Sequence, residues 1–355
     1  MFASEAAARP WQETTPPSRV LAIRMQAFGD VVITLPYLRA LQEMLPGSSI
    51  DLVTRQEDTV LPRAVRLFRH VDGVGGGRSE RRQLLRTPII LPRLASRRYD
   101  VVLDLQNNRI SRTIRRVLRP RAWATFDRFS PESAGERTRQ TIARAGFGLA
   151  RVAASLPLAD PAAGDGLLRS AGYDPSHQLV VLSPAGAFPT RNWPLDRYVR
   201  LVERWPPGRC TQFAMLGLPA LAEKAAWLGD ALGGRLLNLV GRTGPVEAAA
   251  IVQRAALVVT EDCGLMHVAW VSGVPTLALF GSSRHDWSAP LGDHTLCLHS
   301  GDLECGDCMQ PACRYGDVHC LTRWSADEVV SRALALLDRA STRSTPPTIT
   351  ISRCT

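Results

Sequence analysis

The sequence predicts an α/β protein of two domains, each a parallel sheet covered by helices on both faces. Three observations lead to this prediction. The chain has 355 residues, about twice the common size of one domain. Short apolar segments of strand length alternate with helical segments, and the alternation runs through two successive series. The apolar segments are too uniform for a sheet with one face in water.

The first series begins with a strand at 19–25. A helix follows over 30–45, where apolar residues recur at helical spacing, and a second strand follows at 49–54 after a Pro-Gly turn. Further along, a buried type of strand at 100–105 leads into a helix at 109–118. This strand, helix, strand order is typical of a parallel sheet.

The second series has the same order. Its strands are expected at 178–183, 212–216, 257–260 and 275–280, and its helices at 195–204, 220–232, 246–254 and 265–272. Ligands of such folds bind at the carboxyl ends of the strands, so the expected site is the cleft between the two domains.

Composition indicates where the domains begin and end and in which cellular compartment the protein is expected. Residues 1–18 and 341–355 are rich in Pro, Ser, Thr and Ala without periodicity, and we expect both to be poorly ordered. The N-terminal domain is expected at 19–170 and the C-terminal domain at 171–340. No apolar stretch reaches the ~18 residues of a membrane span, and the N-terminus lacks the apolar core of a secretory signal. We therefore expect a cytoplasmic protein.

The excess of positive charge belongs to the N-terminal half of the chain. The net charge is +10, and Lys224 is the only lysine, so arginine carries the charge. Up to Asp165 there are 26 basic and 16 acidic residues, and beyond it 17 of each. The segment 109–121 places arginines around apolar residues, which suits an acidic lipid surface or a phosphorylated acceptor, although a solvated helix face has the same pattern. No nucleic-acid-binding module is recognisable.

The loop after the first strand carries the first candidate for chemistry. Gly29 permits a tight turn, and Asp30 stands where its carboxylate either caps the next helix or serves as a general base. A nicotinamide cofactor is not supported, because the loop has one glycine where the dinucleotide fingerprint has three.

Two segments of the second half predict an anion site. The loop that follows Ser183 is rich in small residues, and Arg191 within it is either a phosphate ligand or a solvated surface side chain. After the strand at 257–260 come two carboxylates, Gly264 and a helix whose first amides suit a diphosphate. Asp262 is placed to accept from ribose hydroxyls. His267 lies on a largely apolar helix, where a buried structural histidine is the alternative.

Four of the eight cysteines lie close together: Cys305, Cys308, Cys313 and Cys320. Such a cluster binds a metal or packs locally. Only its first pair has the spacing of a zinc ribbon, so packing remains the alternative to a metal site.

Taken in order, these segments resemble the bacterial heptosyltransferases, glycosyltransferase family 9, from residue 19 to residue 339. The motifs that carry the resemblance are GDVVITLP and LRAL after the first strand, then YDVVLDLQ, RNWPLDRY, DCGLMH, GVP and LFG. The cysteine cluster most resembles that of the second lipopolysaccharide heptosyltransferases within this family.

The resemblance implies a GT-B architecture, with two Rossmann-like domains whose parallel sheets face a central cleft. It implies an inverting transfer of heptose from ADP-heptose to the inner core of lipopolysaccharide, with no required metal or other cofactor. The implied partners are the nucleotide sugar, a phosphorylated lipid-anchored oligosaccharide acceptor and the inner face of the cytoplasmic membrane, but no nucleic acid.

The resemblance also assigns residues. Asp30 matches the catalytic base, and Arg191 stands at a family lysine that meets the donor phosphates. The expected donor-binding residues are Ser183, Gly186, Arg191, Thr260, Asp262, Cys263, Gly264, Leu265, Met266 and His267. The expected acceptor-binding residues are Arg24, Gln106 and Arg109.

Three departures from the family pattern leave the fold and the reaction class intact but leave the identity of the donor open. Arg191 replaces a lysine, Ser183 replaces a histidine, and Cys263 replaces a serine or threonine. One alternative is a related transferase with another nucleotide sugar or a different acceptor. The other is a non-catalytic anion-binding protein.

Overall fold

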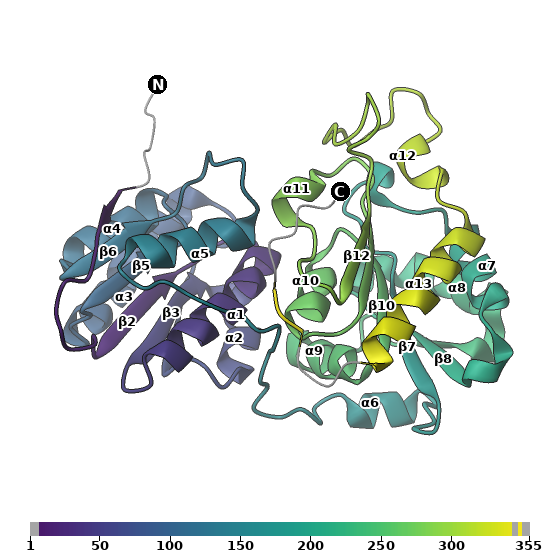
Figure 1. Ribbon diagram of the computed structural model, residues 1–355, viewed down its shortest axis with the longest axis horizontal. Coiled ribbons are helices and arrows are strands. Elements are labelled where there is room, and N and C mark those ends of the chain that lie inside the picture. Colours follow the sequence, from purple (N-terminus) through teal and green to yellow (C-terminus); the bar gives the residue numbers. More distant parts are fainter. Residues whose placement is uncertain (1–6, 343–346, 350–355) are drawn as a thin grey trace. The chain divides into compact units, whose positions relative to one another are not determined.

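The computed structural model describes residues 7–342 and 347–349 and divides the chain into two units (Figure 1). The N-terminal unit ends at Ala159 and the C-terminal unit begins at Asp160. Each unit contains a six-stranded sheet whose strands are almost all parallel. The α/β class and the two parallel sheets predicted from the sequence are therefore confirmed.

The N-terminal sheet has the strand order β1-β6-β5-β2-β3-β4. Its strands are β1 (Ala8–Arg9), β2 (Arg19–Ile23), β3 (Ser49–Arg55), β4 (His70–Val74), β5 (Val101–Asp104) and β6 (Ala122–Thr125). Only β1 is antiparallel to its neighbour. The strand order reverses between β2 and β5, so the loops that follow these adjacent strands open at the same edge of the sheet.

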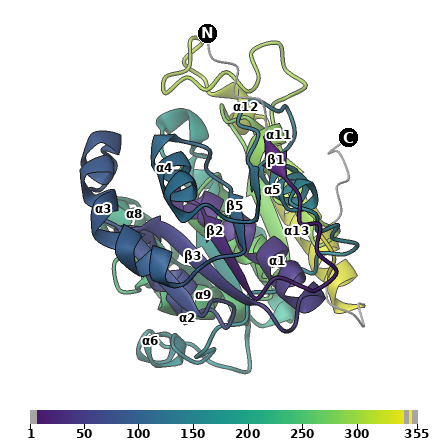
Figure 2. The same ribbon diagram turned by 90° about the vertical axis from the view of Figure 1, so that its left-hand side faces the viewer.

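Helices cover both faces of this sheet. They are α1 (Phe28–Met44), α2 (Val60–Ala64), α3 (Glu80–Ser96), α4 (Arg109–Leu118) and α5 (Ala134–Arg144). Figure 2 shows α3 and α4 packed together on one face, with α1 and α5 on the other. The core beneath α3 and α4 joins Leu21 and Val102 of the sheet to Leu94 of α3 and Ile114 of α4.

The C-terminal sheet is wholly parallel, in the order β12-β11-β10-β7-β8-β9. Its strands are β7 (Gln178–Ser183), β8 (Thr211–Met215), β9 (Leu236–Asn238), β10 (Leu257–Glu261), β11 (Thr276–Leu279) and β12 (Thr295–Leu298). The bounds of β7 are those predicted, and those of β10 differ by one residue.

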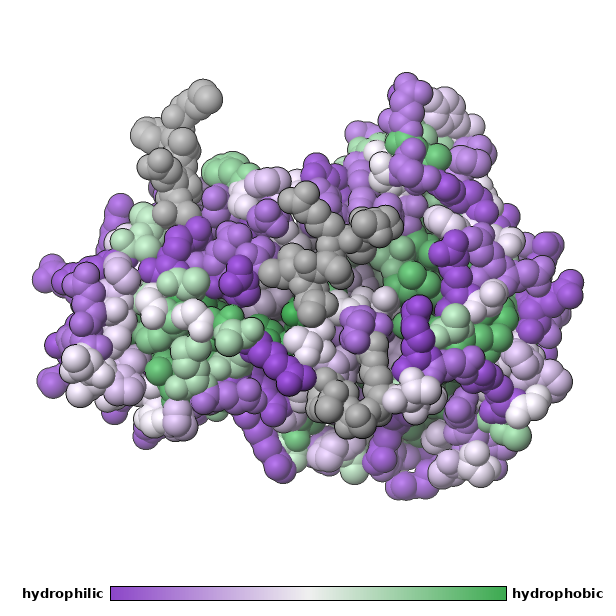
Figure 3. All heavy atoms as spheres, viewed as in Figure 1, coloured by the Kyte–Doolittle hydropathy of each residue, from purple (hydrophilic) through white to green (hydrophobic). Residues whose placement is uncertain are grey.

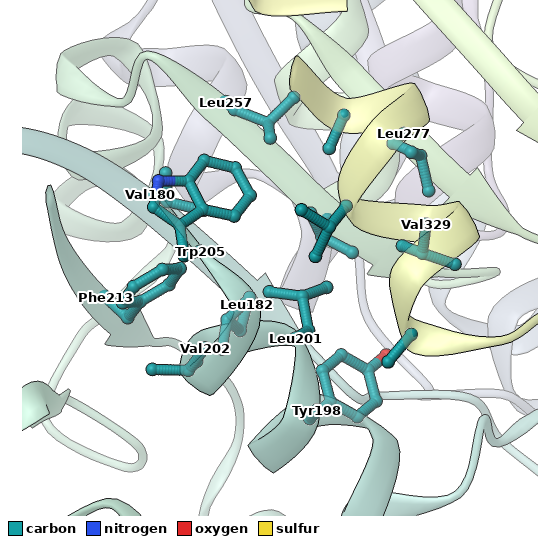
Figure 4. Close-up of a cluster of buried hydrophobic side chains, with 14 of the residues drawn as sticks. Val180, Leu182, Tyr198, Leu201, Val202, Trp205, Phe213, Leu257, Leu277 and Val329 are labelled. Carbon is teal, nitrogen blue, oxygen red and sulfur yellow. The ribbon is translucent and has the colours of Figure 1, made fainter. Parts of the chain in front are cut away.

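Its longer helices form the two covering layers. The helices of this unit are α6 (Asp165–Ser170), α7 (Leu195–Arg204), α8 (Ala222–Leu232), α9 (Pro245–Arg254), α10 (Gly264–Val271), α11 (His285–Ser288), α12 (His319–Thr322) and α13 (Ala326–Ser341). Helix α7 packs between α8 and α13, and α9 packs against α10. Figure 4 shows the core on the α7 and α13 side, where Leu182 and Leu277 meet Leu201 and Val329.

Part of the expected N-terminal extension has defined structure. Strand β1 pairs with β6, and the Trp11 amide donates to the carbonyl of Ala145 at 2.9 Å. Backbone hydrogen bonds to a distant strand therefore hold a segment that has no periodic pattern of its own. Residues 1–6 lie outside the described residues.

The other expected boundaries also shift. The units divide at Ala159, before the expected residue 170, because α6 packs against α9 of the C-terminal unit. Of the expected tail, Ser341 still belongs to α13 and Ile349 is buried, while 343–346 and 350–355 lie outside the described residues.

Most of the surface visible in Figure 3 is hydrophilic, with smaller hydrophobic areas. Among the described residues, no helix is both long enough and apolar enough to cross a bilayer.

Candidate active site

Asp30 lies in the first turn of α1, just after the loop that follows β2. One carboxylate oxygen accepts a hydrogen bond from the Ala27 amide at 2.6 Å, and the other lies 2.8 Å from the Arg24 guanidinium. The Asp30 side chain is 35% exposed, whereas Arg24 is buried and its guanidinium lies over the Phe126 ring at 4.6 Å. Asp30 thus caps the helix and is still partly exposed to solvent. This position fits both roles considered from the sequence, a helix cap and a general base.

Residues after β5 fix this loop. The Gln106 side-chain oxygen accepts hydrogen bonds from the amides of Met25 and Gln26, at 2.9 and 3.2 Å. Asp104, fully buried, accepts from the Asn107 amide at 2.7 Å, and burial raises the pKa of its carboxyl. Two adjacent strand ends therefore position Asp30 through buried polar contacts.

A polar cavity of about 280 Å³ opens at the same edge of the N-terminal sheet. Its walls contain four arginines: Arg78, Arg109, Arg112 and Arg128. Glu80 is the only acidic residue in the lining, and Gln26 and Gln106 connect the cavity to the loop that leads into the first turn of α1, where Asp30 lies. Of the expected acceptor residues, Gln106 and Arg109 line this cavity, while Arg24 does not line it and instead pairs with Asp30. The excess of arginine suits an anionic group.

The C-terminal unit brings the expected donor residues together at the ends of β7 and β10. Arg191 ends a short 3₁₀ turn and lies 3.1 Å from an Asp262 carboxylate oxygen, with both side chains 14% exposed. The guanidinium also lies over the Phe188 ring at 4.9 Å. Arg191 is therefore held in place by a carboxylate and an aromatic ring, unlike a solvated surface arginine.

Glycine is required where this loop folds back on itself. A Cβ atom at Gly186 would lie 2.3 Å from the Arg191 carbonyl oxygen, a distance that forces the backbone to shift. The small residue thus permits the close approach that places Arg191 beside Asp262.

Helix α10 begins next to this pair. Cys263 occupies its N-cap. Its sulfur lies 3.5 Å from the Ser183 hydroxyl and 3.4 Å from that of Thr260. Burial raises the pKa of the Cys263 thiol, which keeps it neutral. The helix start therefore presents amides and small polar side chains, as an anion site needs.

Two other expected donor residues are buried within α10. Met266 is fully buried, and the His267 ring nitrogen Nδ1 accepts a hydrogen bond from the Trp270 indole at 3.2 Å. This arrangement matches the structural alternative weighed for His267. Leu265 and Gly264 belong to the first turn of the helix.

Glu261 holds the loop that carries Arg191, a role that was not predicted from the sequence. Its carboxylate accepts hydrogen bonds from the amides of Gly186 and Trp193, both at 2.7 Å, and from the Tyr198 hydroxyl at 3.2 Å. Burial outweighs these contacts and raises the pKa of Glu261 to about 7. One carboxylate thus anchors both ends of the loop that carries Arg191.

Lys224 adds a second anchor. Its ammonium donates to the Pro184 carbonyl at 2.9 Å and to the Asn192 side chain at 2.5 Å. Lys224 is the only lysine of the chain, and Glu261 is the first of the two carboxylates at the end of β10; these were the only signals in the sequence. The contacts of the two side chains with the loop join residues 32 to 75 positions apart.

The cysteine cluster lies near α12 as free thiols. Burial, and then the proximity of Cys308, Cys313 and Cys305, raise the pKa of Cys320 to about 11. Among the described residues, the atoms that lie close enough to share one metal ion belong instead to His285, Asp286 and Asp307. Arg284 already pairs with Asp286 through two hydrogen bonds. The metal alternative for the cysteines stays a prediction.

The family model described as glycosyltransferase family 9 (heptosyltransferase) matches residues 90–319, well over half of the chain. The chain belongs to glycosyltransferase family 9. Lipopolysaccharide heptosyltransferase 1 of Pseudomonas aeruginosa is 27% identical to it over 328 residues, covering 84% of this chain and 88% of that protein. The chain is therefore a glycosyltransferase.

Solved structures share the fold of this family-9 glycosyltransferase. A family 9 glycosyltransferase from Veillonella parvula matches with a TM-score of 0.77 at 19% identity, covering 91% of this chain and 97% of that one. The E. coli heptosyltransferase WaaC, solved with ADP, matches with a TM-score of 0.66 at 17% identity, covering 90% and 99%. These matches establish the GT-B fold.

The role of Glu261 in this glycosyltransferase predicts a pH dependence of stability. Because the pKa of Glu261 is raised on folding, the folded state binds the proton more tightly than the unfolded state does. This contribution to stability is fully present below the pKa of the unfolded state and is lost as the pH rises through about 7. Glu261→Gln removes the titration. The thermal midpoint of the wild type minus that of the variant should be larger at about pH 5 than at about pH 8. A difference between the two proteins that stays constant with pH would refute the assignment.

Proposed function

We propose that this glycosyltransferase transfers heptose from ADP-heptose to a sugar of the inner core of lipopolysaccharide, with inversion at the anomeric carbon. The observation that carries the proposal is the pairing of Arg191 with Asp262 at the start of α10. This arrangement combines a phosphate ligand, a ribose acceptor and a helix N-terminus in one place. The names of the relatives, lipopolysaccharide heptosyltransferase and heptosyltransferase with ADP, support the choice of donor.

Asp30 is the proposed general base. Its carboxylate takes the proton from the acceptor hydroxyl while that oxygen attacks the anomeric carbon from the side opposite the diphosphate. The new carbon–oxygen bond forms as the bond to the diphosphate breaks, and the proton later passes from Asp30 to solvent. Arg24 and the Ala27 amide hold the carboxylate in a fixed orientation, which favours this proton transfer.

The departing ADP carries away the electron pair of the broken bond. In this proposal, Arg191 and the amides of the first turn of α10 bind the diphosphate oxygens on which that charge develops, and the position of the Arg191–Asp262 pair at the start of the helix supports it. We propose that these groups supply the positive charge that the leaving group needs, so that no metal ion is required.

The arginine-lined cavity of the N-terminal unit is the proposed subsite for an anionic group of the acceptor, a phosphate or a carboxylate. Its four arginines against one glutamate favour such a group, and Gln106 contacts both the cavity and the loop of Asp30. The acceptor we propose is lipid-anchored, and the enzyme then works at the inner face of the cytoplasmic membrane.

Calorimetric titration with ADP, UDP and GDP tests this function before any lipid acceptor is prepared. We expect ADP to bind at least about tenfold more tightly than the other two nucleotides, a difference of ~1.4 kcal/mol. Preference for UDP or GDP would reject heptose as the donor sugar and leave a related transferase. Absence of binding at about millimolar nucleotide would favour the anion-binding alternative.

A further inference from the structure

Helix α3 exposes apolar side chains on its outer face. Leu85 and Ile89 are 72% and 66% exposed, and one helical turn separates them, so they lie on the same face. The opposite face supplies the core, with Ile90 and Leu94 buried. The exposed pair therefore adds nothing to the packing of the N-terminal unit and leaves apolar surface in water.

Positive charge surrounds this pair. Helix α3 contains four arginines and a single acidic residue, Glu80. Of the four, Arg93 pairs with Asp72 at 2.7 Å, while Arg81, Arg82 and Arg86 are exposed and form no ion pair with the described residues. An apolar ridge between unpaired arginines combines the two features of a helix that lies on an anionic lipid surface.

Helix α4, the basic segment singled out in the sequence, is built differently. Its residues Ile110 and Ile114 are fully buried in the core. Arg115 lies over the Trp123 ring at 3.9 Å and 3.8 Å from Asp104, so its charge is used within the fold. Val117 is the single large apolar side chain that α4 exposes among the described residues, at 47%, against two more exposed ones on α3. Helix α3 also packs against the edge strand β4, and α4 against the more central β5 (Figure 2), so α3 has the larger unused apolar and basic face.

We propose that the outer face of α3 docks on an anionic lipid surface, with Leu85 and Ile89 in the interface and Arg81, Arg82 and Arg86 on lipid phosphates. A second copy of the chain is a poor occupant, since two such faces repel each other. Nucleic acid would match the arginines but has no use for the exposed Leu85 and Ile89, and α3 contains no aromatic residue for base stacking.

The position of α3 connects this surface to the proposed acceptor subsite. Glu80 and Gln83, in the first turn of α3, line the arginine-rich cavity. A bilayer against the outer face of the helix therefore lies next to the cavity that takes the anionic group of a lipid-anchored acceptor. The inference rests in this respect on the proposed function, but lipid docking itself needs no donor and no acceptor.

The test uses the full-length chain and vesicles that contain no lipopolysaccharide. Binding is measured by co-sedimentation with vesicles of phosphatidylcholine alone and of phosphatidylcholine with phosphatidylglycerol. We expect binding only to the anionic vesicles. The double variants Leu85→Ser/Ile89→Ser and Arg82→Gln/Arg86→Gln should each lower the partition coefficient by about tenfold or more. The control Leu218→Ser/Trp227→Ser, which removes two exposed apolar residues of the C-terminal unit, should bind as the wild type does.

The outcomes separate the two proposals. Because the variants change exposed residues, their thermal midpoints and their affinities for ADP should equal those of the wild type. The docking surface would be overturned if the wild type and both α3 variants bound vesicles equally, or if the wild type bound neutral and anionic vesicles equally. It would also be overturned if a stoichiometric amount of duplex DNA displaced the protein from the vesicles. Failure of ADP selectivity would overturn the proposed function and leave the vesicle result unaffected.

Discussion

Asp30→Asn should lower the rate of sugar transfer by about 10²- to 10⁴-fold, the usual contribution of a general base. The amide of asparagine keeps an oxygen to accept from the Ala27 amide, so the start of α1 keeps its cap. It cannot take a proton from the acceptor hydroxyl at neutral pH. Affinity for ADP should stay within about twofold of the wild type, because Asp30 and the donor residues belong to different units. The measurement is the initial rate of ADP release together with calorimetry.

Asp327→Asn is the matched control for this variant. Asp327 also lies in the first turn of a helix, α13, and its side chain is 73% exposed. This substitution should leave the transfer rate unchanged. Near-normal transfer by folded Asp30→Asn would show that Asp30 only caps the helix, the alternative raised by its position in the sequence.

Arg191→Ala should weaken binding of ADP by about 10- to 100-fold, the loss expected for one hydrogen-bonded charge worth ~1.5–3 kcal/mol. The guanidinium is already ordered by Asp262 and Phe188, so little conformational entropy is lost when a diphosphate binds. The substitution also leaves Asp262, which is 14% exposed, without its cation close to the bound anion. Calorimetry with ADP measures the effect.

Arg191→Lys separates charge from geometry at this position. Lysine keeps the positive charge but loses the planar fork, and it is the residue that the family resemblance places here. We expect this variant to retain most of the affinity for ADP. An unchanged dissociation constant in Arg191→Ala would remove Arg191 from the donor site.

The central strands of both sheets could be predicted because they are uniformly apolar and bounded by polar residues. The structure places β2, β5, β7 and β10 within a few residues of the prediction. Strands β4, β6, β9 and β12 were missed, since they are short and each contains at least one polar residue. Strand β1 was missed because only its pairing with β6 makes it a strand.

Helix α3 shows how packing overrides a local signal. Pro88 and Pro92 lie within it, and proline in a helix interior removes a hydrogen bond, so the sequence favours a break here. Both prolines lie on the exposed side, while Ile90 and Leu94 on the opposite side enter the core. The packing of these residues sustains a helix that propensity alone does not predict.

The residues of the candidate site could be proposed from the sequence, but the contacts that hold them in position could not. Asp30, Arg191 and Asp262 follow strand ends, where parallel sheets place their ligands. The function of Glu261 depends on the loop after β7 folding over the end of β10, a contact between residues 75 positions apart. A single sequence contains no local pattern for such a contact.

The most direct test of the account is a transfer assay with ADP-heptose and lipopolysaccharide that lacks its inner-core heptose. We expect stoichiometric release of ADP and a gain of one heptose in the mass of the acceptor, with the product linkage inverted relative to the donor. Transfer from a UDP- or GDP-linked sugar to the same acceptor, or release of ADP without any gain in acceptor mass, would contradict heptosyl transfer to lipopolysaccharide.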